Sequence, residues 1–95
     1  MTAGVEIALG IEHPYRTELL RLLRKGYTVN KAIKKIAVMV AKKTSYGNKS
    51  RALSNIRKLC EMMGLSEGPK VEKLLKHMNE VFERENDVSL GLSNG

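Results

Sequence analysis

Apolar residues recur every three or four positions along most of this chain, and that spacing limits the possible folds more than any other feature. The clearest run is Val29, Ile33, Ile36, Ala37 and Val40, which forms one apolar stripe along a helix. A half-buried strand would need apolar residues at every second position, and only residues 5–9 allow that reading. The spacing therefore predicts an all-α protein.

Helix-start and helix-stop residues divide the pattern into four segments. Pro14 and Pro69 suit the first turn of a helix, where the missing N–H costs no hydrogen bond. Thr28 is a candidate N-cap, and Gly26 suits the stop before it. The expected helices cover residues 14–25, residues 29–43, a segment from Asn48 or Ser50 to Gly64, and residues 69–85. With short connections and one apolar face each, they predict a compact bundle of about four helices.

The length of 95 residues leaves room for one domain, so a two-lobed enzyme or a barrel does not fit. We expect residues 1–13 to form an N-terminal arm, residues 14–86 the helical domain and residues 87–95 a flexible tail. Within the arm, residues 5–9 fit either a short extended segment or a helical turn.

Catalytic and metal-binding patterns are missing from the sequence. The single cysteine, Cys60, excludes an internal disulfide framework and a multi-cysteine zinc site. It falls on the apolar stripe of the third helix, which favours a buried thiol over a nucleophile. His13 and His77 fall in different elements and form no catalytic set. We therefore expect no enzyme, no metal, no cofactor and no small-molecule substrate, in a reducing intracellular compartment such as the cytoplasm, nucleus or nucleoid.

Positive charge is concentrated in the middle of the chain. The formal net charge is +7, yet residues 14–63 alone hold 13 Lys and Arg against two Glu. Residues 1–13 and residues 64–95 are each slightly acidic. Such a concentration of positive charge within a folded segment favours a polyanionic partner.

Helical geometry gathers part of this charge on one side. At about 100° per residue, Lys31, Lys34, Lys35 and Lys42 share the side of the second helix that lies opposite its apolar stripe. On the third helix, Arg51 and Lys58 likewise point away from the core. The candidate phosphate contacts are Lys31, Lys34, Lys35, Lys42, Lys43, Arg51 and Lys58, and the flanking candidates are Tyr46, Lys49 and Arg57.

Two stretches of the sequence match the helix-turn-helix pattern in part. Residues 59–66 resemble its first helix and turn, although Val71 and Leu74 come one position late for its second helix. The junction from Arg24 to Thr28 would instead make the lysine-rich second helix the reading helix. Its first helix carries charges where the pattern has apolar residues.

We expect a small non-enzymatic protein that binds the phosphate backbone of duplex DNA or RNA, with a duplex favoured over a single strand. Four aromatic residues are a thin supply of stacking platforms for a single strand. Membrane binding is not expected, because the usual Trp and Phe anchors of interfacial helices are missing. A homodimer is expected. The alternatives are a helix-turn-helix regulator that reads DNA sequence and an interaction module that docks an acidic protein partner.

Overall fold

The computed structural model describes the backbone of residues 3–65 and 68–94 and the side chains of residues 4–65 and 68–85. Within these ranges the protein is an all-α bundle without strands. The elements are α1 (Ala3–Leu9), α2 (Arg16–Arg24), α3 (Val29–Lys43), a short 3-10 turn η1 (Tyr46–Asn48), α4 (Lys49–Met62) and α5 (Pro69–Asn94). The predicted all-α fold class is confirmed.

The segment that fitted either a strand or a helical turn is the helix α1. It packs against α2, and Ala8 is fully buried in the core. Gly4 lies so close to α3 that an added Cβ would come within 2.9 Å of Val29 Cγ2. After α1, His13 Nε2 lies 2.9 Å from the backbone oxygen of Asn55, and His13 Nδ1 accepts a hydrogen bond from the Tyr15 N–H. These contacts hold the connection to α2 against α4.

Glycine stops α2 and α4 in the same way. Gly26 has φ of 105° and Gly64 has φ of 82°, a left-handed conformation that costs glycine little. The N–H of Tyr27 donates to the Leu22 oxygen, and the N–H of Gly26 donates to the Leu23 oxygen, which together form a Schellman motif. The Thr28 hydroxyl then caps α3 by accepting from the Lys31 N–H at 3.2 Å. The stop and the cap predicted between the first two helices are confirmed.

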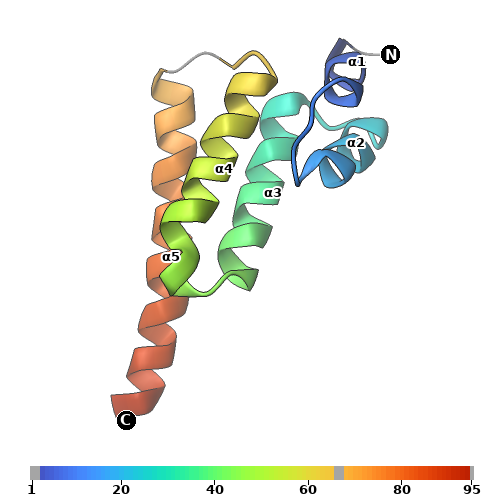
Figure 1. Ribbon diagram of the computed structural model, residues 1–95. Coiled ribbons are helices and arrows are strands. Elements are labelled where there is room, and N and C mark those ends of the chain that lie inside the picture. The colour runs from blue at the N-terminus through green and yellow to red at the C-terminus, as the bar shows by residue number, and fades with distance from the viewer. Residues whose placement is uncertain (1–2, 66–67, 95) are drawn as a thin grey trace.

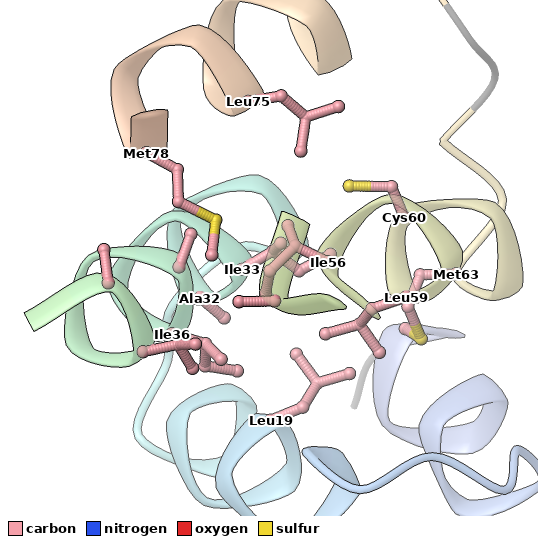
Figure 2. Packing of buried hydrophobic residues seen from close by; sticks show 14 of the residues in the cluster. Leu19, Ala32, Ile33, Ile36, Ile56, Leu59, Cys60, Met63, Leu75 and Met78 are labelled. Atoms are coloured by element: carbon pink, nitrogen blue, oxygen red, sulfur yellow. The ribbon is translucent and has the colours of Figure 1, made fainter. Parts of the chain in front are cut away.

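Helix α3 lies at the centre of the bundle and packs against α2, α4 and α5. Figure 1 shows α3, α4 and α5 side by side, with α2 across the N-terminal end of α3. Figure 2 shows the side chains that meet between them, including Ile33 and Ile36 of α3, Ile56 and Leu59 of α4, and Met78 of α5. Each fully buried side chain of this size contributes about 1.5–3 kcal/mol to folding.

Three helix boundaries differ from the expected ones by two residues or more. Helix α2 begins at Arg16 rather than Pro14, which lies in the turn before it, and α4 ends at Met62 rather than Gly64. Helix α5 begins at Pro69 as predicted, but its backbone stays helical to Asn94 and projects past the α3–α4 connection (Figure 1). The sequence predicts a flexible tail over residues 87–95, whereas the backbone is helical as far as Asn94. Gly95 lies outside the described residues.

Candidate functional site

The outward side of α3 carries five exposed lysines. We call Lys31, Lys34, Lys35, Lys42 and Lys43 the lysine strip. The opposite side of the helix is buried through Ile33, Ile36 and Val40, as the apolar spacing predicts. Helix α3 contains no Asp or Glu. In the part of the chain that the structure describes, none of the five ammonium groups forms an ion pair.

One lysine of the strip rests on an aromatic ring. Lys35 Nζ lies 5.2 Å from the centroid of Tyr27, which follows Gly26 in the turn before α3. A cation–π contact of this kind at an exposed site contributes about 0.5–1 kcal/mol. The contact leaves the positive charge of Lys35 uncompensated by any anion, because the ring carries no net charge.

A shallow hollow of about 730 Å³ lies between α2 and α3, and we call it the α2–α3 hollow. The whole lysine strip lines it, together with five apolar or aromatic side chains. Those five are Leu22, Tyr27, Ile36, Val38 and Met39. Val38 and Met39 are half-buried and stand outside the core cluster. A basic surface with an apolar floor therefore replaces the uniformly charged face that the lysine spacing alone indicated.

Val38 and Met39 are not among the predicted site residues, although the sequence carries a signal for them. Residues 37–41 are five consecutive apolar positions, and a helix can turn only part of such a run toward one core. Ala37, Val40 and Ala41 are buried. The two residues between them must then appear on the side of α3 that carries the lysines.

The positive surface continues from α3 onto α5. A second hollow of about 790 Å³, the α3–α5 hollow, is lined by Lys34 together with basic side chains of α5. These are Lys70, Lys73, Lys76 and His77, with Glu80 as the acidic residue beside them. Lys34 lines both hollows, so the lysine strip and the α5 residues form one connected surface. None of these α5 residues is among the predicted contacts, because α5 has mixed charge along its length.

Two acidic residues of α5, Glu72 and Glu83, interact with basic residues of α4 instead. Glu72 Oε2 accepts a hydrogen bond from Arg57 Nη1 at 3.2 Å, and Glu83 Oε2 pairs with Lys49 Nζ at 3.2 Å. Tyr46 Oη donates to the same Glu83 oxygen at 2.8 Å. We call these five residues the α4–α5 seam. All three predicted flanking contacts, Tyr46, Lys49 and Arg57, therefore lie in the seam and interact with acidic residues of the same chain.

Hydrogen bonds in the α4–α5 seam shift the pKa values of Glu83 and Lys49. Those from Tyr46 and Lys49 lower the pKa of Glu83 below its ordinary 4.5. Those to Tyr46 and Glu83 raise the pKa of Lys49 above its ordinary 10.5. Both shifts favour the charged forms, so the Lys49–Glu83 pair stays ionised across the neutral range.

The last two predicted contacts lie on another side of the molecule. Arg51 and Lys58 are exposed on the side of α4 opposite its buried Ile56, and that buried side faces α3 and α5. The ten predicted site residues are thus divided among the lysine strip, the α4–α5 seam and the outer side of α4. The structure brings only the five of the strip together around one hollow.

The two helix-turn-helix candidates differ in geometry. Between α4 and α5 lie residues 63–68, and Figure 1 shows these two helices side by side. A helix-turn-helix has a turn of about 3–4 residues and helices that cross at about 90–120°, so this junction does not have that geometry. Between α2 and α3 lie residues 25–28, and α2 crosses the end of α3 (Figure 1). Of the two junctions, the one at Gly26 is the one whose turn has the expected length.

Cys60 is fully buried, and burial raises the pKa of its thiol above the ordinary 9.0. Among residues 4–65 and 68–85, no group of three His, Cys, Asp or Glu side chains is placed to hold a metal ion. None of the described helices is long and apolar enough to cross a membrane. Two apolar side chains of α1, Ile7 and Leu9, are exposed, and the homodimer stays a prediction.

Comparisons with protein-family models, with curated proteins and with solved structures give no significant match.

Proposed function

We propose that this protein binds the phosphate backbone of a nucleic-acid duplex through the lysine strip of α3 and the adjoining lysines of α5. One observation carries the proposal, namely that the five lysines of the strip share one exposed side with no ion pair to any described acidic residue. Basic residues elsewhere, such as Lys49 and Arg57, are matched by acids of α5.

The strip is electrostatically unfavourable in the free protein. Lys31 and Lys35 are one helical turn apart, and like charges at this spacing destabilise a helix by about 0.2–0.5 kcal/mol. A phosphate group between them would replace that repulsion with two attractions. Binding would also release the cations condensed on the duplex, which is the main driving force for this kind of contact.

The dimensions support contact with several phosphates. Lys31 and Lys42 are eleven positions apart in α3, or about 16 Å along the helix axis. A duplex carries about one negative charge per 1.7 Å of its axis, so the strip spans a segment with roughly ten phosphates. Lys70 and Lys73 of α5 would extend the contact sideways from Lys34.

A sequence-reading version of this function is supported by the turn between α2 and α3. The second helix of a helix-turn-helix places its first residues against base edges in the major groove. In this protein those residues would be Asn30, Lys31 and Lys34, all exposed near the start of α3. Selection from a pool of random duplexes would test this version, because pure backbone binding enriches no consensus.

The experiment for the main proposal is a binding titration with a generic duplex at several salt concentrations. Six phosphate contacts on B-form DNA predict a slope of about −5 for log K against log salt. Duplex RNA, duplex DNA and single strands would then compete for the protein, and we expect a duplex to win. Failure of both duplexes to bind at about 50 mM salt, where such binding is strong, would refute the proposal.

A further inference from the structure

We propose that the α2–α3 hollow binds an acidic amphipathic helix of a protein partner. This proposal goes beyond nucleic-acid binding and does not depend on it. It rests on the floor and the rim of the hollow, which differ in chemistry and together match one kind of ligand.

The floor is apolar. Val38 and Met39 are half-buried on α3, and Leu22 of α2 and Tyr27 of the intervening turn face the same hollow. A phosphate backbone would compensate the lysines but would place charged oxygens above these side chains. A row of leucines or similar residues would instead remove the remaining apolar surface from water, which is favourable by about 25 cal/mol per Å².

The rim is almost entirely basic. All five lysines of the strip line the hollow. The one acidic side chain there, Glu18, is held by Arg21, with Nη2 at 2.7 Å from Oε1. Carboxylates on both flanks of an apolar stripe would therefore find ammonium groups and little repulsion. Such a pattern, apolar on one side and acidic on its flanks, belongs to helices that dock in grooves of opposite charge.

The size of the hollow suits a short helix. Its α3 lining runs from Lys31 to Lys43, which is about 18 Å at 1.5 Å per residue. That length corresponds to about three turns of a partner helix lying along α3. The volume of about 730 Å³ lies within the range of about 300–1,000 Å³ that is usual for ligand pockets.

The two ligands would compete. An acidic helix in the hollow would occupy Lys31, Lys35 and Lys42, which the proposed duplex contact also needs. A partner of this kind would thus release the protein from a nucleic acid, or prevent it from binding one.

The probe is a labelled 14-residue peptide with Leu at helical i, i+3, i+4 spacing and Glu on both flanks. The control is a peptide of the same composition in which the leucines are scattered around the helix. We expect the amphipathic peptide to bind at least tenfold more tightly than the scrambled one, and to displace a labelled duplex.

The variants separate the floor from the rim. Val38→Ala combined with Met39→Ala truncates the two floor side chains that α3 contributes outside the core and keeps high helix propensity, and Met39→Gln changes polarity at similar length. We expect each to weaken the peptide, by about tenfold for the double variant, and to leave duplex affinity within about twofold. Circular dichroism and thermal unfolding of each variant verify the fold.

Three outcomes would overturn the proposal. Equal affinity for the amphipathic and scrambled peptides would mean that charge alone binds them. Loss of duplex affinity in parallel with peptide affinity in the folded floor variants would make the hollow part of the nucleic-acid site. If the amphipathic peptide did not bind at low salt, the proposal would be refuted. Floor-dependent peptide binding without any duplex binding would support this inference and refute the proposed function.

Discussion

The lysine strip of α3 and the α4–α5 seam both come from the basic middle of the sequence, yet they use their charges differently. In the seam, Glu72 and Glu83 of α5 pair with Arg57 and Lys49 of α4. At the strip, no described acid pairs with any of the five lysines. A count of basic residues therefore overstates the positive charge that is available to a partner. Part of that charge is neutralised by ion pairs within the chain.

The largest expected effect is on the strip. A triple variant changes three lysines of the strip to glutamate, namely Lys31→Glu, Lys35→Glu and Lys42→Glu. It removes three phosphate contacts and adds three repulsive charges. We expect duplex affinity at low salt to fall by more than about 100-fold. Fluorescence anisotropy measures the loss, and unchanged circular dichroism shows that the lysines do not support the fold. Unfolding of this variant would instead assign them a packing role.

A smaller effect is expected on α5. Neutralising Lys70 and Lys73 by Lys→Gln substitution should weaken duplex binding by a few fold and flatten the salt dependence by about two units of slope, because each lysine accounts for about one contact. The same titration series at several salt concentrations provides both values. An unchanged slope would confine the interface to α3 and leave the α3–α5 hollow outside it.

For the free energy of unfolding, we expect the larger effect in the α4–α5 seam and the smaller one in the lysine strip. Arg57→Gln breaks the ion pair with Glu72 and should lower the free energy of unfolding by up to about 1 kcal/mol, the upper range for an exposed pair. Lys35→Gln should change it by less than about 0.5 kcal/mol, since it relieves repulsion from Lys31 but loses the contact with Tyr27. Urea denaturation compares the two. A larger loss for Lys35→Gln would show that the strip is structural.

The smallest effect concerns pH and the seam. The hydrogen bonds from Tyr46 and Lys49 lower the pKa of Glu83. The resulting stabilisation is therefore present above pH 4.5, the ordinary value, and is lost as the pH falls through the lowered one. We expect Glu83→Gln to be less stable than the parent protein at neutral pH and to match it in strong acid. Thermal unfolding across the acid range tests this, and a difference that persists at the acid limit would point to lost packing.

Local rules explain how much of the fold could be predicted. The apolar stripe of α3, its Thr28 cap and the stop at Gly26 act within a few residues, so they can be recognised in the sequence. Helix α1 could not be assigned, because its seven residues depend on tertiary contacts such as the burial of Ala8 and the approach of Gly4 to Val29. The extension of α5 past Glu85 carries no apolar spacing as regular as that of α3.

The candidate site was predictable only in part. The direction of Lys31, Lys35 and Lys42 follows from the helical repeat alone. The engagement of Lys49 and Arg57 does not, because it depends on how α5 rotates Glu83 and Glu72 toward α4. The α2–α3 hollow likewise depends on tertiary packing, because side chains of both helices and of the turn between them line it.

The most direct test of the central claim compares two double variants with the same change in net charge. One carries Lys31→Glu and Lys35→Glu on the lysine strip, and the other carries Arg51→Glu and Lys58→Glu on the outer side of α4. Duplex affinity is measured for both by anisotropy at one low salt concentration. The account predicts a loss of more than about tenfold for the strip variant and less than about threefold for the α4 variant. Equal losses would contradict it, since binding would then follow net charge rather than the position of the lysines.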